Sequence, residues 1–122
     1  MDRVVHFEIL APEPAKVQDF YANVFGWEIA KRQGAEDYWL ATTGHDDALG
    51  INGALMTARD GTPRTVVTVK VDDLDASMAD VAEHGGKIIL GKMAVPGVGW
   101  IAYCVDPQGG TVGMVQREEN AE

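Results

Sequence analysis

The same order of elements occurs twice along this chain of 122 residues. In the first half, residues 4–9 alternate between apolar and polar side chains, and residues 14–25 follow a helical pattern that ends at Gly26. About 60 residues later, residues 66–71 alternate again, and a second helical pattern covers residues 74–83. A repeat of this length predicts one supersecondary unit used twice, which constrains the fold before any single residue is considered.

Further extended segments follow each predicted helix. After the first helix they cover residues 27–30, 38–42 and 50–56, and after the second they cover residues 87–90, 100–105 and 111–116. The predicted order is therefore β-α-β-β-β, twice. Helices on one face of mostly antiparallel strands place the chain in the α+β class.

Turn-forming residues in the middle of the chain predict how the two halves are joined. We expect one domain over residues 1–122, made of a module at 1–58 and a module at 64–117. Residues 59–64 read as a short, turn-rich linker. Residues 118–122 read as a charged tail.

Each predicted helix carries an apolar stripe that should face its sheet. The first stripe consists of Val17, Phe20, Tyr21 and Val24, and the second of Met78, Val81 and Ala82. Residues 91–99 contain three glycines and a proline and are predicted to be a long loop. The part of this loop from 93 to 99 is a candidate lid.

Composition excludes several classes of partner. The chain is 46% hydrophobic and 24% charged, as soluble globular proteins are. No apolar run approaches the roughly 20 residues of a membrane helix, and the N-terminus enters a strand pattern directly, so we expect no membrane span and no signal peptide. The net charge of −9 argues against nucleic acid and anionic membrane surfaces. A single cysteine fits a reducing, cytoplasmic environment.

Several chemically active side chains have plain structural explanations. His84 precedes a glycine pair at a helix end, where a cation suits the dipole. Asp72 and Asp73 fit a helix N-cap, and Asp106 fits a turn. Cys104 is expected to be buried rather than nucleophilic. His45, with the aspartates after it, is expected in a solvated loop.

Short motifs at ordered spacings add a family resemblance. They are Phe20-Tyr21 late in the first helix, Phe-Gly-Trp at residues 25–27 and Asp-Pro-Gln-Gly at residues 106–109. Together with the repeat, they make residues 4–116 resemble the vicinal-oxygen-chelate superfamily, which includes glyoxalase I, bleomycin-resistance proteins and extradiol dioxygenases. Within it, the chain resembles the single-domain group described as predicted lactoylglutathione lyase-related enzymes. The motifs that carry this resemblance are His-Phe-Glu-Ile at residues 6–9, Gly-Ile-Asn-Gly-Ala-Leu at 50–55 and Pro-Gly-Val-Gly-Trp-Ile-Ala-Tyr-Cys at 96–104.

The resemblance implies a fold and a kind of site. It implies two βαβββ modules whose strands form a curled sheet around a central cleft, commonly in a homodimer. It also implies a divalent metal in that cleft, held by residues of both modules, which polarises paired oxygen atoms of a substrate.

At most of the positions where the family has metal-binding residues, this sequence has residues that do not bind metals. His6 lies at the first-strand position, where the family often has histidine. The corresponding position in the second module is Val66 or Thr68, and the usual last-strand glutamate falls on Gly113. Near the end of the first module, Asn52 offers only an amide. Because catalytic sites generally use three protein ligands, the usual metal site is predicted to be largely missing, with a divalent metal at His6 weak or absent.

The remaining polar and aromatic residues define a candidate ligand site in the cleft. His6 and Glu8 share one face of the first strand and are the candidate catalytic pair, with His6 as base. Asn52 is a candidate polar anchor. Candidates for an aromatic wall are Trp39, Trp100 and Tyr103.

Two functions fit these residues. One is a glyoxalase-like enzyme of the lyase or isomerase type that acts on a small organic metabolite in the cleft between the modules, although glyoxalase I activity itself is not expected. The other is a non-catalytic small-molecule binder, as bleomycin-resistance proteins are. The empty ligand positions favour the binder, and the His6–Glu8 pair favours the enzyme. An interaction domain without a small-molecule ligand is a third, less favoured reading.

Overall fold

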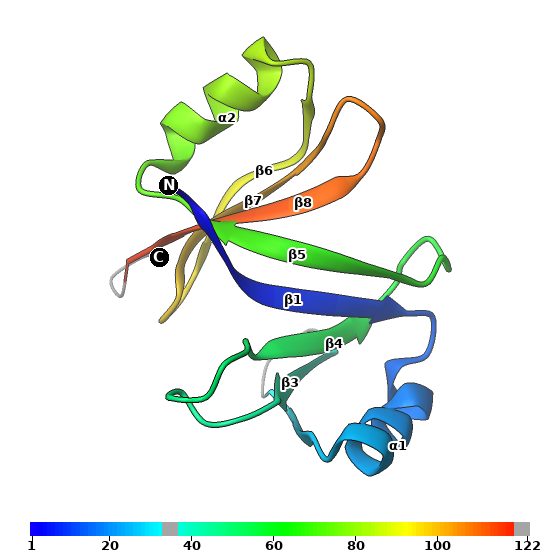
Figure 1. Cartoon of the computed structure of the whole chain (residues 1–122). Helices are drawn as coiled ribbons and strands as arrows, with labels where there is room; N and C mark the ends of the chain where they lie inside the picture. Colours follow the sequence, from blue (N-terminus) through cyan, green and yellow to red (C-terminus); the bar gives the residue numbers. More distant parts are fainter. Residues whose placement is uncertain (33–36, 119–122) are drawn as a thin grey trace. The chain divides into compact units, whose positions relative to one another are not determined.

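The computed structural model describes residues 1–32 and 37–118 and contains two compact units (Figure 1). One compact unit is His6–Val66, and the other is Met1–Val5 with Val67–Glu122. From here on, we call these units the first and the second module. The described residues form eight strands and two helices in the order β-α-β-β-β, twice, which confirms the predicted α+β class. None of the described helices is long and apolar enough to cross a membrane. The predicted tail beyond Glu118 lies outside the described residues.

The strands of the first module have the order β2-β3-β4-β1. Their bounds are β1 (Arg3–Ala11), β2 (Glu28–Lys31), β3 (Tyr38–Thr42) and β4 (Gly53–Thr57). β4 runs parallel to β1 and antiparallel to β3. It begins at Gly53 rather than at residue 50: Gly50 has a φ of 138°, and the Ile51 carbonyl and the Asn52 Oδ1 accept hydrogen bonds from Thr43.

Helix α1 (Pro14–Phe25) has the predicted bounds. Its proline lies in the first turn, where the missing N–H costs no hydrogen bond. Gly26 ends it with a φ of 75°, a left-handed conformation that glycine adopts without a steric penalty. Its N–H donates to the carbonyl of Ala22 at 2.9 Å.

The predicted apolar stripe of α1 is only half right. Val17 and Tyr21 are half-buried, and the Tyr21 ring stacks on Trp27 with centroids 5.1 Å apart. Phe20 and Val24 are instead 55% and 56% exposed. The buried stripe is narrower than predicted. Val17 and Tyr21, four residues apart, face the sheet, whereas Phe20 and Val24 lie on the flank of the helix.

The strands of the second module have the order β5-β8-β7-β6. Their bounds are β5 (Arg64–Lys70), β6 (Lys87–Val95), β7 (Gly99–Val105) and β8 (Thr111–Arg117). β8 runs parallel to β5 and antiparallel to β7, which repeats the arrangement of β4 in the first module.

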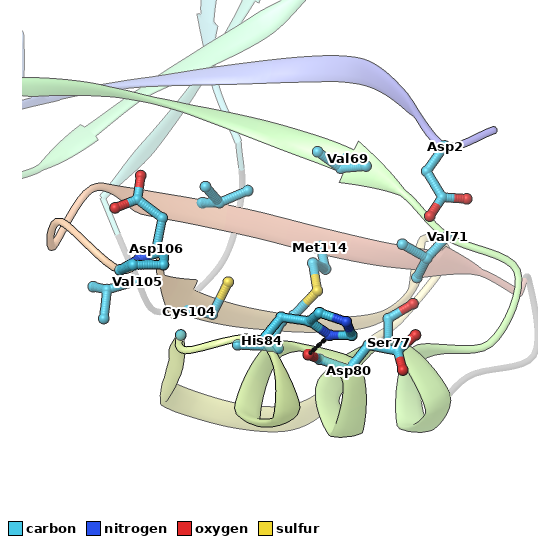
Figure 2. A pocket seen from close by; sticks show the side chains of 14 residues that line it. Asp2, Val69, Val71, Ser77, Asp80, His84, Cys104, Val105, Asp106 and Met114 are labelled. Atoms are coloured by element: carbon cyan, nitrogen blue, oxygen red, sulfur yellow. Dashed lines mark hydrogen bonds between the residues drawn. The ribbon is translucent and has the colours of Figure 1, made fainter.

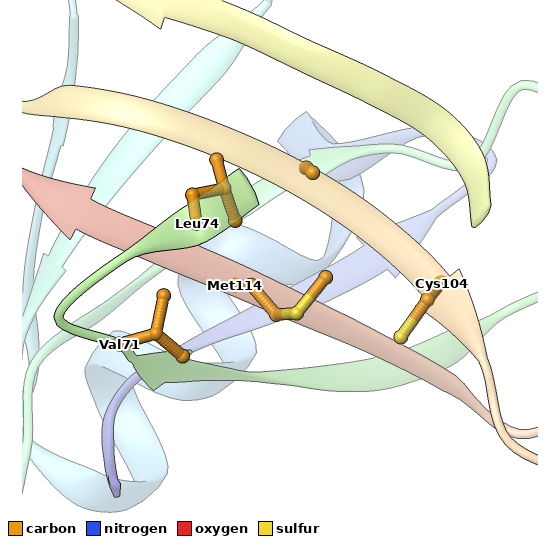
Figure 3. Close-up of a cluster of buried hydrophobic side chains, with 5 residues drawn as sticks. Val71, Leu74, Cys104 and Met114 are labelled. Atoms are coloured by element: carbon orange, nitrogen blue, oxygen red, sulfur yellow. The ribbon is translucent and has the colours of Figure 1, made fainter. Parts of the chain in front are cut away.

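Helix α2 (Leu74–Glu83) packs on the strands of the second module. Leu74, its first residue, belongs to a cluster of buried hydrophobic side chains (Figure 3). The carboxylate of Asp73 caps it, as predicted, by accepting from the N–H of Ala76 at 3.1 Å. The core cluster consists of Val71, Leu74, Ala102, Cys104 and Met114. Met78 and Val81 of the predicted stripe pack against this cluster, but Ala82 is exposed. The expected burial of Cys104 is confirmed.

The predicted loop at residues 91–99 is wrong, and so is the lid. β6 continues to Val95 and pairs with β7, and only residues 96–98 form the turn between them. The register of β6 shifts twice, between Ile88 and Leu90 and between Leu90 and Met93. Such irregularities let a strand pass a glycine without losing its partner, so the local signal for a loop was overridden by pairing.

Candidate functional site

Two polar side chains of β1 lie on the face of the first module's sheet that points away from α1. His6 and Glu8 alternate with Phe7, so they point to the opposite side from it. Phe7 contacts Trp27 with ring centroids 5.5 Å apart, and Trp27 stacks on Tyr21 of α1. His6 and Glu8 therefore lie on the helix-free face of this sheet. Glu8 is only 5% exposed.

Tyr38 joins them from β3. It pairs with Met56 of β4, which in turn pairs with Leu10 of β1, so Tyr38 shares a face with His6 and Glu8. The Tyr38 hydroxyl lies 3.1 Å from His6 Nε2 and donates to Glu8 Oε2 over 3.5 Å. We call these three residues the His6 cluster.

The Tyr38 phenol stays protonated at neutral pH. Burial raises the pKa of its hydroxyl far above the ordinary value, and the negative charge of Glu8 raises it further. Arg32 opposes this shift without cancelling it. When the single phenol proton points to Glu8, His6 Nε2–H has to donate to the phenol oxygen, which leaves the basic lone pair of the imidazole on Nδ1.

Two residues predicted for the site lie elsewhere in the first module. Trp39 follows Tyr38 on β3, so it points to the helix-covered side, where it is 9% exposed and Lys31 Nζ lies 5.4 Å from its ring. Asn52 holds a loop: its Oδ1 accepts from the N–H of Thr43 at 2.8 Å. The structure therefore brings neither Trp39 nor Asn52 to the His6 cluster.

Strand pairing defines the corresponding positions of the second module. Glu8 pairs with Ala54, and Thr68 pairs with Gly113. Thr68 thus corresponds to Glu8, and Val66, two residues earlier on β5, corresponds to His6. With Ala54 of β4 taken as the counterpart of Gly113 of β8, this register favours Val66 over Thr68 as the counterpart of His6. Ile101 pairs with Val115 as Tyr38 pairs with Met56, so it takes the place of the phenol. None of these counterparts can ionise.

The last-strand position is filled by neighbouring side chains. A Cβ atom placed on Gly113 would lie 3.1 Å from Thr68 Oγ1 and 3.2 Å from Tyr103 Cε1. The space that a longer side chain would need is thus occupied by two residues of the same module.

The two aromatic candidates of the second module point to different sides. Trp100 packs against the core cluster, and its Nε1–H donates to Glu118 Oε2 at 2.8 Å. Tyr103 lies next to Gly113 on the helix-free side. Of the three aromatic residues predicted for a ligand wall, only Tyr103 is on the helix-free face of its module.

The described residues contain one group of side chains with metal-ligand spacing. Asp80, Glu83 and His84 on α2 place one ligand atom each within 4.8 Å of one another, and all three are exposed. Neither His6 nor Glu8 belongs to such a group of three among the described residues. The hydroxyl that joins them comes from Tyr38. A neutral phenol is not among the imidazole, carboxylate and thiolate groups that usually bind divalent metals.

Tyr38 is the site residue that sequence analysis missed. Its strand was predicted with the correct bounds, but the side chain that faces His6 depends on the register of β3 against β4 and of β4 against β1. A shift of one residue would have exchanged Tyr38 for Trp39. No local signal in residues 38–42 distinguishes these alternatives.

Comparison with known proteins agrees with this architecture. The sequence model of the Glyoxalase/Bleomycin resistance protein/Dioxygenase superfamily matches residues 3–113. Over 113 residues the chain is 26% identical to the protein named "Putative glyoxylase CFP32" of Mycobacterium bovis, a match that covers 89% of this chain and 43% of that protein. The chain thus spans less than half the length of the curated relatives that it matches.

Solved structures show the same fold at low sequence identity. The hypothetical protein BH1468 from Bacillus halodurans C-125 has a TM-score of 0.70 with 13% identity, and the match covers 99% of this chain and 98% of that one. The methylmalonyl-CoA epimerase of Mycobacterium tuberculosis has a TM-score of 0.69 with 14% identity, and the match covers 94% and 87%. Identities this low establish the shared fold alone.

Proposed function

This chain belongs to the Glyoxalase/Bleomycin resistance protein/Dioxygenase superfamily, and we propose that it is a glyoxalase-like enzyme of the lyase or isomerase type. It takes a small organic metabolite at the His6 cluster and moves a proton there. The observation that carries this proposal is the hydrogen-bonded chain from His6 Nε2 through the Tyr38 hydroxyl to Glu8 Oε2. An imidazole oriented by a hydroxyl and a buried carboxylate is an arrangement that general-base catalysis uses.

Each member of the cluster has a distinct part in the proposed reaction. His6 Nδ1 takes a proton from a carbon next to a carbonyl group and returns it to the product, so the step needs no oxidant or reductant. Tyr38 holds the ring through its oxygen atom. Glu8, at the far end of the chain, stabilises the positive charge that the imidazole gains. Removal of a general base typically costs 10²–10⁴-fold in rate.

The residues at the family's metal-binding positions favour a reaction in which side chains, rather than a metal, move the proton. We infer that the usual metal site is largely missing, because Val66 and Gly113 have no donor atoms and Thr68 offers only a hydroxyl. Calorimetric titration of Zn²⁺ and Ni²⁺ into wild type and His6→Ala tests this point. We expect the same weak heats from both proteins. Tight stoichiometric binding that His6→Ala abolishes would contradict it.

The proposed activity is tested by deuterium exchange. Candidate carbon acids, among them methylmalonyl-CoA and the hemithioacetal of methylglyoxal and glutathione, are incubated with the protein in D₂O and followed by NMR. For a compound that exchanges, His6→Ala should lose at least about 100-fold in rate. Tyr38→Phe should lose less, because it keeps the ring but not the hydrogen bonds. His45→Ala is the matched control in an exposed loop of the same module and should exchange like wild type. Exchange by His6→Ala at the wild-type rate would overturn the proposal.

The alternative function is non-catalytic binding of a small molecule at the same residues. The absence of ionisable counterparts in the second module favours it. A compound that raises the melting temperature of wild type but not of His6→Ala, and exchanges no proton, supports the binder and rejects the enzyme.

We also infer that a second copy of the chain covers the exposed apolar surface of α1, formed by Phe20, Val24 and Phe25. Each of these residues is more than half exposed. At a net charge of −9, two copies repel each other, and an apolar patch is a surface on which they can meet without placing like charges in contact. Light scattering should show a dimer for wild type and for the exposed control Ala15→Ser, and a monomer for the double variant Phe20→Ser/Phe25→Ser. A monomeric wild type contradicts the inference.

A further inference from the structure

The second module has a pocket on the helix-covered side of its sheet (Figure 2). It is an open depression of about 400 Å³ between α2 and strands β5, β7 and β8, and Asp2 lies at one end. This volume is at the lower end of the range of about 300–1,000 Å³ that holds small ligands. Its lining includes no residue of the His6 cluster, so it is separate from the proposed reaction site.

The floor of the pocket is apolar. Its side chains are Val69, Val71, Val81, Cys104, Val112 and Met114. Three of them belong to the core cluster, so the pocket opens directly onto the hydrophobic core. Burial, and then the negative charge of Asp106, raises the pKa of the Cys104 thiol, which keeps this group uncharged at neutral pH. A hydrocarbon group is the complement of such a floor.

The polar groups around the floor are mainly hydrogen-bond acceptors. Asp2, Asp80 and Asp106 contribute carboxylates from the start of the chain, from α2 and from the turn after β7. Ser77 adds one hydroxyl. Among the described residues that line the pocket there is no lysine and no arginine.

His84 borders the pocket beside Asp80. Its Nδ1 lies 2.9 Å from the carbonyl oxygen of Asp80, as the dashed line in Figure 2 shows. A carbonyl can only accept, so Nδ1 carries the proton of this hydrogen bond, and when the ring is neutral its Nε2 is an acceptor.

Asp106 keeps its charge at neutral pH. Its Oδ1 accepts from the N–H groups of Gly110 at 3.0 Å and Gln108 at 2.8 Å. These two hydrogen bonds hold the pKa of the carboxyl below its usual range. The end of the pocket near β7 therefore remains anionic.

We propose that this pocket binds a small primary amine with an apolar body. The hydrocarbon part lies on the valine and methionine floor, and the protonated amino group lies on the α2 side of the pocket, at the Asp80 carboxylate and His84. An ammonium group has three N–H donors and no acceptor, which matches a rim of acceptors. The net charge of −9 further favours a cation over a neutral or anionic molecule of the same size.

The first test compares three ligands of one chain length by isothermal titration calorimetry. Hexylammonium should bind with one site per chain, 1-hexanol at least about fivefold more weakly, and hexanoate not detectably. Butylammonium should bind roughly tenfold more weakly than hexylammonium, because two methylene groups leave the floor. Equal binding of hexanol and hexylammonium, or no heat from hexylammonium, would overturn the proposal.

Variants on α2 locate the site. Ser77→Phe places a ring in the pocket and should abolish hexylammonium binding, whereas Ala79→Phe, on the same helix but not in the lining, should not. Asp80→Asn should weaken binding about threefold to fivefold, as expected for one partly solvated charge. Asp72→Asn removes an equal charge just before α2, outside the lining and outside the group of Asp80, Glu83 and His84, and should leave binding unchanged. Melting curves establish that each variant is folded.

Two further results decide between this site and others. His6→Ala should bind hexylammonium like wild type, because the pocket does not include the His6 cluster. If Asp72→Asn weakens binding as much as Asp80→Asn, the amine is only part of a diffuse ion atmosphere and the proposal is wrong. Undiminished binding by folded Ser77→Phe would reject it as well.

Discussion

The helix-free faces of the two modules have the same scaffold and different chemistry. In the first, His6, Glu8 and Tyr38 form a hydrogen-bonded chain. In the second, strand pairing places valine, threonine and isoleucine at the corresponding positions. The difference teaches that a repeat of backbone pairing does not require a repeat of function, because pairing uses main-chain atoms that every one of these residues supplies.

A second contrast concerns the helices. α2 has a side-chain cap and contributes to a buried cluster of five residues. α1 has no side-chain cap and leaves aromatic side chains exposed at its end, although each helix fully buries only its first residue, Pro14 in α1 and Leu74 in α2. The module with the ionisable cluster therefore has the helix with the larger exposed aromatic surface.

The largest effect should come from a substitution that breaks the pairing of β1 with β4. A methyl group on Gly53 would lie 2.5 Å from the carbonyl oxygen of Phe7 and 2.6 Å from its ring. Gly53→Ala should lower the free energy of unfolding by about 1–3 kcal/mol in urea denaturation, as overpacking does. Gly91→Ala is the control, since no heavy atom lies within 4 Å of its Cβ position. Equal stabilities of the two variants would contradict this expectation.

Tyr38, unlike its counterpart Ile101, should make the free energy of unfolding depend on pH in alkaline solution. The pKa of Tyr38 is raised in the folded state above its ordinary value of 10.0, so the unfolded chain loses this proton first. Below about pH 10 the contribution of Tyr38 to the free energy of unfolding is constant. Above that pH this contribution falls by at most about 1.4 kcal/mol per pH unit. Denaturation between pH 9 and pH 11 should show a steeper decline for wild type than for Tyr38→Phe. Parallel curves would show that the phenol titrates normally.

The helix caps provide a test of about 1 kcal/mol. Asp73→Ala removes the carboxylate that accepts from Ala76 N–H and should destabilise the chain by about 1 kcal/mol. Glu13 occupies the same place before α1 but makes no capping hydrogen bond, only an exposed ion pair with Lys16. Glu13→Ala should therefore change the free energy of unfolding by less than about 0.5 kcal/mol. A similar loss for both variants would show that the caps are equivalent.

The smallest effect is expected where a substitution makes the modules more alike. Ala54 of β4 already has the methyl group that Gly113 of β8 lacks. Gly113→Ala should cost less than about 1 kcal/mol, because its two close neighbours, Thr68 Oγ1 at 3.1 Å and Tyr103 Cε1 at 3.2 Å, are side-chain atoms that need to move only slightly. Differential scanning calorimetry should show a smaller shift than for Gly53→Ala. A larger shift would mean that Thr68 is held in place.

Local patterns predicted most of the elements. Both helices have the predicted bounds, because Pro14 and Gly26 frame the first, and Asp73 caps the second. β6 was cut short at Leu90 because Gly91 reads as a break, whereas pairing with β7 carries the strand to Val95. Strands depend on partners far away in sequence, which a local pattern cannot contain.

The candidate site could be predicted only in part. Strand alternation placed His6 and Glu8 on one face, because that depends on period two alone. The third member, Tyr38, depends on two registers at once, and the pocket under α2 depends on how far a helix stands from its sheet. Neither quantity has a signature in one segment of sequence.

The sequence by itself determined the class of the fold, the repeat and the residues able to ionise, since these follow from periodicity and composition. The tertiary structure alone decided which of those residues meet. It brought Tyr38 rather than Trp39 to His6, because the register of three strands sets the direction of every side chain along them. It also gave the second module an apolar pocket bordered by carboxylates from segments far apart in the chain.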